Sequence, residues 1–148
     1  METHAGKILS LFIIEKNTKE AIKKTMLTLD KNGILNDKHY NKDPERSILI
    51  SSLESYHMAK EKLGVQMPEG YLGENLLIDF NPYHLSSGTQ LHIGTAILEI
   101  TQNCTLCNHL SKLDKRIPKL LKNDRGIFAK VIQAGEIKVN DTIRVVTP

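Results

Sequence analysis

The sequence predicts an α+β fold, a small strand-rich β-barrel with about seven short strands and two helices. Short apolar runs recur along the 148 residues and are bounded by turn-forming residues. Two segments carry the helical spacing of apolar residues, and they do not alternate with the strands as βαβ repeats would require. Because the sequence has no internal repeat or linker-like stretch, we expect residues 1–148 to form a single domain.

Three predicted strands lie in the first third of the chain. Residues 7–14, an apolar run, and residues 21–29, which alternate only in part, both read as strands separated by a polar turn, and residues 47–50 form a short buried strand. Before this third strand, the polar residues 36–46 have neither a strand period nor a helix period. Loops of this length in compact domains tend to be functional or mobile, so this loop is a candidate functional segment.

The two helices are predicted from caps and spacing. The first begins near Ser51, an N-cap serine with Glu54 three positions later, and ends at Gly64, which suits a left-handed C-terminal cap. The second is predicted from apolar residues at helical spacing, namely Leu110, Leu113, Ile117, Leu120 and Leu121. Pro118 is expected to kink or interrupt this second helix.

The remaining strands follow the first helix. Residues 76–80 form one strand, and residues 91–100 supply either one bent strand or two short ones around Gly94. The last two predicted strands are residues 127–132 and 137–146.

Composition narrows the classes of partner. The 20 basic and 17 acidic residues give a net charge of +3, which is too balanced to require a polyanionic partner. The chain has no tryptophan and few aromatic residues, so it lacks the stacking platform of single-strand nucleic-acid binders. Two cysteines do not make a disulfide framework, and residues 7–14 are too short to span a bilayer. We therefore expect a cytoplasmic protein that binds neither nucleic acid nor membrane.

Cys104 and Cys107 are the only cysteines, and they form a C-x-x-C pair after a predicted strand. A thiolate can bind a soft metal, carry sulfur as a persulfide or form a disulfide. A structural zinc site needs four ligands, and His84, His92 and His109 lack the expected spacing. Zinc binding, thiol redox chemistry and simple burial of two small residues all remain open for an isolated C-x-x-C pair.

Three further polar groups could bind an anion or could be ordinary turns. The loop after Gly33 carries Asp37, Lys38, His39 and Arg46, which bring together charges of both signs. The segment at residues 73–76 reads G-E-N-L, so that Glu74 and Asn75 follow a glycine at a strand start. Arg125 lies in a D-R-G turn before the strand at residues 127–132.

Taken together, these motifs resemble the MOSC domain, the C-terminal domain of molybdenum cofactor sulfurases, which also occurs as small stand-alone bacterial proteins. The resemblance covers residues 7–145. The G-E-N-L stretch fits the family signature without change, and residues 33–39 resemble its G-L-x-G-D-R-H stretch. Cys107 falls on the family cysteine, and the residues from Arg125 fit the closing R-G-x-[YF]-[AG]-x-V pattern.

The sequence also departs from the family pattern. Asn36 and Asn140 stand where the family often has glycine, and asparagine tolerates the left-handed backbone region better than other non-glycine residues. Lys38 replaces an arginine, which weakens planar bidentate recognition of an anion. Leu106 replaces the proline usual before the family cysteine, and Cys104 stands where an arginine is usual.

The resemblance implies a molybdenum cofactor (molybdopterin) protein. Cys107 would then ligate molybdenum for the reduction of a small-molecule substrate, as in an oxidoreductase, or carry sulfur as a persulfide in cofactor handling. Either activity would need a redox or sulfur-donor protein acting in trans. The resemblance also implies cofactor-binding residues, which are Asp37, Lys38, His39, Arg46, Glu74, Asn75 and Arg125. The alternative is a non-catalytic C-x-x-C module that binds zinc or performs thiol redox chemistry.

Overall fold

The computed structural model describes residues 2–105 and 110–148. Its first strands are β1 (Glu2–Ile14), β2 (Ala21–Lys24), β3 (Met26–Asp30), β4 (Gly33–Ile34), β5 (Ile48–Ser52) and β6 (Leu76–Ile78). The later strands are β7 (Gln90–Ile93), β8 (Ala96–Asn103), β9 (Ile127–Gln133), β10 (Gly135–Lys138) and β11 (Thr142–Val146). The helices are α1 (Leu53–Leu63), α2 (Ile117–Leu120) and the 3₁₀ turns η1 (Pro44–Arg46) and η2 (Leu110–Lys112).

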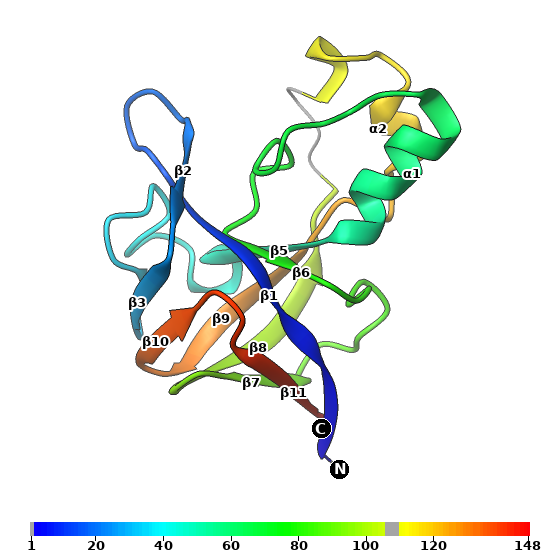
Figure 1. Cartoon of the computed structure of the whole chain (residues 1–148). Coiled ribbons are helices and arrows are strands. Elements are labelled where there is room, and N and C mark those ends of the chain that lie inside the picture. Colours follow the sequence, from blue (N-terminus) through cyan, green and yellow to red (C-terminus); the bar gives the residue numbers. More distant parts are fainter. Residues whose placement is uncertain (1, 106–109) are drawn as a thin grey trace.

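Seven of the described strands close into a barrel (Figure 1). Their order is β11-β7-β8-β9-β5-β6-β1, and the ring closes because β1 also pairs with β11. The described neighbours are antiparallel except β5 and β6, which run parallel. β2 extends the sheet from β1, and β10, β3 and β4 form a small second sheet. The predicted strand-rich α+β barrel is confirmed.

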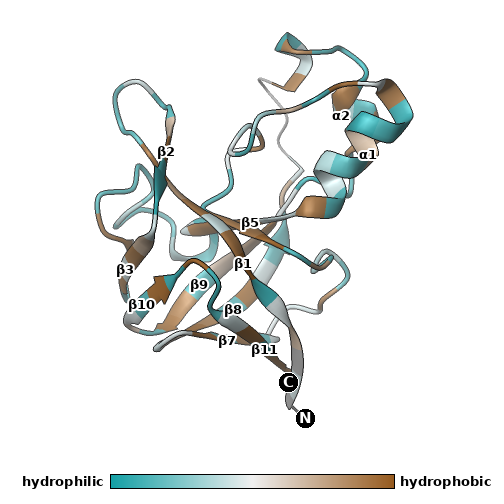
Figure 2. Cartoon of the chain, in the orientation of Figure 1, coloured by the Kyte–Doolittle hydropathy of each residue, from teal (hydrophilic) through white to brown (hydrophobic). Residues whose placement is uncertain are grey.

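Alternating burial explains the barrel strands. Along β8 the side chains of Ala96, Leu98 and Ile100 point into the barrel and are buried, while the residues between them are partly exposed. All five residues of β5 are buried. Ile48 and Ile50 pack in the barrel core, and Leu49 packs in a separate cluster with Cys104 and Phe128. Figure 2 shows the same pattern, with hydrophobic stretches along the barrel strands and a hydrophilic β1–β2 connection.

The helices form a second, smaller core at one end of the barrel (Figure 1). Tyr56 and Ala59 of α1 pack with Leu77 of β6, and Leu110 and Ile117 complete the cluster from the later segment. No helix in residues 2–105 or 110–148 combines the length and apolar character needed to cross a membrane.

The helix at residues 53–63 forms as predicted, with one correction at its start. The N-cap is Ser52, whose side-chain oxygen accepts a hydrogen bond from the Glu54 amide at 3.1 Å, rather than Ser51. Gly64 caps the other end with φ of 68°. The second helix is shorter than its apolar spacing suggests, because the described part consists of η2 and the single turn α2 around Pro118.

Two predicted strands are each divided between two sheets. The run at 21–29 breaks at Thr25, so that β2 pairs with β1 while β3 pairs with β10. The run at 137–146 breaks at Asn140, whose φ of 74° turns the chain from β10 into β11. Asn36 has φ of 71°, so both asparagines that replace a family glycine adopt the left-handed conformation.

Gly94 and Gly64 provide a matched test of backbone strain and steric overlap. Both have positive φ, 58° and 68° respectively. An added Cβ at Gly94 would overlap the carbonyl oxygen of Glu136 and lie 2.7 Å from Asp141 Oδ2, whereas Gly64 has no atom within 4 Å of that position. Gly64→Ala should therefore lower the free energy of unfolding by about 1 kcal/mol, the cost of the left-handed backbone alone.

Gly94→Ala should lower the free energy of unfolding by roughly 3 kcal/mol, because the backbones of β10 and the β7–β8 turn must move apart. Urea denaturation of both variants measures the difference. Equal losses would show that steric overlap at the β7–β8 turn has no role.

Candidate functional site

A cavity of about 1060 Å³ opens beside the barrel. One wall comes from residues 18–21 in the β1–β2 connection, and a second comes from the loop that contains Lys38, His39 and η1. The segment at 68–73 forms a third wall. The polar loops reach the cavity because β1 ends near it and β5 and β6 begin near it, and loops at strand ends commonly carry functional groups.

Positive charge predominates in the described lining. The basic residues are Lys19, Lys38, Lys42, Arg46, Lys112 and Arg125, with His39 beside them. The carboxylates are Glu20, Asp43 and Glu69. Six permanent cations against three anions favour an anionic ligand, because like charges lining a concave surface raise the local concentration of the opposite charge.

The structure brings four of the predicted cofactor-binding residues, Lys38, His39, Arg46 and Arg125, to this cavity. It places the other three, Asp37, Glu74 and Asn75, outside the described lining and buries them almost completely, with exposed fractions of 6%, 0% and 1%. Each of these three side chains forms hydrogen bonds with main-chain groups of segments that form the cavity walls.

Asn75 joins two strands at the point where β6 begins. Its Oδ1 accepts a hydrogen bond from the Leu49 amide at 3.0 Å, and its Nδ2 donates to the Phe12 carbonyl at 3.2 Å. The same Nδ2 donates to Asp37 Oδ1 at 3.0 Å. The Asn75 side chain therefore links β1, β5 and the loop at residues 36–46.

Asp37 anchors that loop to the end of β1. Its Oδ1 accepts from the Ile14 amide at 2.7 Å, and its Oδ2 accepts from the His39 amide at 3.0 Å. The His39 ring nitrogen Nδ1 lies 3.4 Å from Oδ2. Burial raises the pKa of Asp37, but hydrogen bonds from His39 and Ile14 outweigh it, so the net pKa lies below its ordinary value of 3.8. Asp37 is therefore an anionic clamp that presents Lys38 and His39 to the cavity.

Glu74 supports a different wall. Its Oε2 accepts from the Tyr56 hydroxyl at 2.6 Å and from the Gly70 amide at 3.3 Å. Burial raises the pKa of Glu74, and Oε1 has no hydrogen-bond partner among the described residues. Burial and the neighbouring Glu74 also raise the pKa of Tyr56. The pair holds Gly70, a lining residue with φ of 88°.

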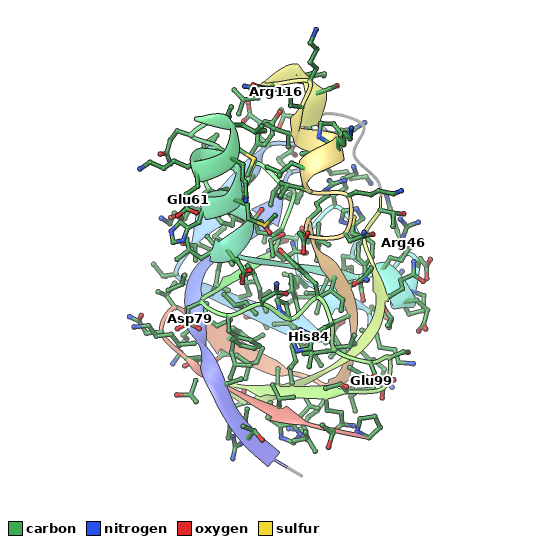
Figure 3. All side chains as sticks on the ribbon, turned by 90° about the vertical axis from the view of Figure 1, so that its right-hand side faces the viewer. Arg46, Glu61, Asp79, His84, Glu99 and Arg116 are labelled. Carbon is green, nitrogen blue, oxygen red and sulfur yellow. The ribbon has the colours of Figure 1, made fainter. Side chains whose placement is uncertain are left out.

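The floor of the cavity is apolar and was not predicted from the sequence. Leu49, Cys104 and Phe128 form a separate hydrophobic cluster, and all three line the cavity. The Arg46 guanidinium lies 4.9 Å from the centre of the Phe128 ring, a cation–π distance. Figure 3 shows Arg46 at the edge of the barrel near β8 and β9. The sequence gives one signal that could have pointed to Phe128, which is its match to the aromatic position of the closing family pattern.

Cys107, the predicted catalytic and metal-ligating residue, lies outside the described residues. The nearest described cavity residues on either side of it in the sequence are Cys104 and Lys112. Cys104 is 3% exposed, and its amide donates to the Gly126 carbonyl at 2.9 Å. In residues 2–105 and 110–148 no group of three or more histidine, cysteine or acidic side chains is arranged to hold a metal ion.

The Asp37 clamp gives a pH-dependent prediction. Asp37→Asn should lower the free energy of unfolding at pH 7 by roughly 2 kcal/mol, because an amide nitrogen replaces an oxygen that accepts hydrogen bonds. A carboxylate with a lowered pKa stabilises the folded state fully above the unfolded pKa of 3.8 and loses that contribution as pH falls through the folded pKa. The difference in the free energy of unfolding between wild type and variant should therefore stay constant above pH 5 (~1 unit above the unfolded pKa) and become smaller below pH 3.8. Urea denaturation across that pH range measures this difference in free energy. A difference that grows on acidification would contradict the stabilising role of the Asp37 carboxylate.

Comparison with known proteins identifies relatives. A family model described as the MOSC domain matches residues 37–144. No curated protein matches the sequence. The YuaD protein from Bacillus subtilis has a crystal structure with a TM-score of 0.86 at 20% identity, covering 100% of both chains.

Two further solved structures share the fold. YiiM from Geobacillus stearothermophilus has a TM-score of 0.74 at 17% identity, covering 96% of this chain and 75% of its own. YiiM from Escherichia coli has a TM-score of 0.70 at 20% identity, covering 94% and 70%. The match of the family model over most of the sequence shows that this chain belongs to the MOSC domain family.

Proposed function

We propose that this protein binds a molybdopterin-type cofactor in the cavity and that Cys107 is its thiolate ligand to molybdenum. The observation that carries the proposal is the positively charged cavity, with Cys104 and Lys112 on its walls at positions that flank Cys107 in the sequence. Membership of the MOSC family supports the same cofactor. The volume of about 1060 Å³ lies just above the usual range for small-molecule sites, which is roughly 300–1,000 Å³.

The donor set of the cavity fits such a group. Lys38, His39 and Arg46 offer N–H donors to a phosphate, which is best bound by cationic and planar donors. Leu49 and Phe128 provide an apolar surface for a flat ring system. Asp37 and Asn75 act in this proposal by holding the loop that carries these donors, whereas Glu74 holds Gly70 on another wall. Arg125 adds a buried cation.

The cofactor, when bound, supplies a redox-active metal centre. The chain supplies a soft sulfur ligand at Cys107, which suits a polarizable metal, and walls that hold the ligand beside a water-poor apolar floor. The activity proposed is the reduction of a small molecule, with electrons from a redox protein acting in trans. We further propose that residues 1–148 act as one domain in the reducing cytoplasm, where thiols persist.

The test is the metal and pterin content of protein isolated from cells that make the cofactor. Wild-type protein should contain molybdenum and pterin, and Cys107→Ser should lose most of the molybdenum because a hydroxyl is a harder, less acidic ligand than a thiol. The matched variant Cys104→Ser should keep it. Equal molybdenum content in wild type and Cys107→Ser would refute metal ligation by Cys107.

Two other outcomes distinguish the rival roles of the cysteines. Addition of a sulfur atom to Cys107 by a cysteine desulfurase, seen by mass spectrometry without bound molybdenum, would indicate a persulfide carrier. Stoichiometric zinc that is lost in Cys104→Ser would indicate the non-catalytic C-x-x-C module.

The phosphate donors give a separate prediction. Lys38→Glu should weaken cofactor binding by about tenfold or more, because it replaces an attractive charge with a repulsive one in the cavity. Lys24→Glu makes the same change on the exposed strand β2, outside the lining, and should leave cofactor content unchanged. Cofactor content after equilibrium dialysis measures both variants, and an equal decrease in both would point to a general charge effect.

A further inference from the structure

Arg125 is a buried cation that lacks a counter-ion among the described residues. Its side chain is 7% exposed, yet it lines the cavity. Nε and Nη2 both donate to the carbonyl oxygen of Leu72, at 3.3 and 3.1 Å, while Nη1 has no hydrogen-bond partner in the described structure. The ion pairs formed by the described residues do not include Arg125.

A buried network holds the main chain of Arg125 in place. Its carbonyl oxygen accepts hydrogen bonds from the Ser51 hydroxyl at 2.7 Å and from the Tyr83 hydroxyl at 3.2 Å. The Ser55 hydroxyl lies 2.6 Å from that of Tyr83 and donates to the carbonyl oxygen of Asp124. The protein's own groups therefore hold Arg125 at both its main chain and its guanidinium, and such preorganisation reduces the entropy lost on binding.

The buried positive charge of the Arg125 guanidinium favours the binding of an anion. An arginine stays charged in proteins, so burial cannot neutralise it. A buried charge without a partner costs several kcal/mol, and a guanidinium has five N–H donors, of which two are used at Leu72. The two donors on Nη1 suit the oxygens of a carboxylate or an inorganic oxyanion.

The position of Arg125 separates it from the other cations of the cavity. Its neighbour Gly126 accepts the hydrogen bond from the Cys104 amide, at the point where the chain leads toward Cys107 in the sequence. Lys38 and His39 instead lie on the loop that Asp37 fastens to β1, and both are partly exposed. The cavity therefore has one fixed, buried cation and a separate set of solvated cations.

We propose that Arg125 recognises an oxyanion group on the substrate, while Lys38, His39 and Arg46 serve the phosphate of the cofactor. The substrate class is a small molecule that carries a carboxylate or is itself an oxyanion. This assignment rests on the proposed function, because it places the substrate in the cofactor cavity. The shape of the site is independent of it, because all its described groups are present without a metal or a cofactor.

The test is calorimetric titration of the cofactor-free full chain with sulfate and with acetate at low ionic strength. Wild type should bind one equivalent, and Arg125→Met should weaken binding on the order of tenfold or more, as expected for loss of a charged hydrogen bond. Arg125→Lys should fall between them, because it keeps the charge but loses the planar donors. This conservative variant keeps the test valid if Arg125→Met fails to fold.

Arg116→Met is the matched control, because this arginine pairs with Asp114 outside the described lining. Figure 3 shows Arg116 at the far end of the helical layer from Arg46. It should bind both anions as wild type does. Wild-type affinity in Arg125→Met, or no anion binding by wild type, would overturn the proposal.

Cofactor loading distinguishes the two sources of the oxyanion. If Arg125→Met takes up molybdenum and pterin as wild type does, Arg125 serves the substrate as proposed. If loading is lost together with anion binding, Arg125 serves the cofactor phosphate and the substrate assignment is wrong. If wild type never contains molybdenum but binds anions through Arg125, the proposed function fails and the oxyanion site stands.

Discussion

The hydrogen bonds of Asn75 are the constraint on which the cavity end of the barrel depends. At the start of β6 the main chain of Asn75 accepts from Phe12 and donates to Leu49, each at 2.8 Å, and its side chain adds one further bond to each of these residues. Asn75 therefore links β1 to β5 at the position just before β6 begins and pairs with both of these strands. A shorter or apolar side chain would leave two buried main-chain groups unsatisfied, which is costly in a dry interior.

The carboxyl and amide groups of the family motifs are buried outside the cavity lining, whereas basic side chains line the cavity. Asn75 reaches Asp37, and Asp37 fixes the loop that carries Lys38 and His39. Glu74 holds the Gly70 amide on another wall. Burial suits these groups, because a hydrogen bond made away from water is stronger and positions its partner more exactly than a solvated one. The side chains of Asp37, Glu74 and Asn75 thus shape the site without lining it.

The local sequence predicted those parts of the fold that depend on local interactions. The helix at residues 53–63 and the turns at Asn36 and Asn140 follow from caps and from the tolerance of asparagine for the left-handed region. The break at Thr25 could not be predicted, because the partial strand alternation runs through it without a turn residue, and only pairing with β1 and β10 separates the two halves. The apolar floor at Leu49 was missed for the same reason, since it is assembled from residues far apart in the sequence.

Cys104 gives the cavity lining an uncharged side chain in an apolar cluster. The family resemblance places an arginine there, whereas this chain has Cys104 packed with Leu49 and Phe128 in the apolar floor. Of the charged side chains that the structure describes as buried, Arg125 is the one cation. A second guanidinium beside it would repel it and would share its anion. With Cys104 in that place, the low-polarity floor strengthens the interaction of Arg125 with any oxyanion that reaches it, because less solvent screens the pair.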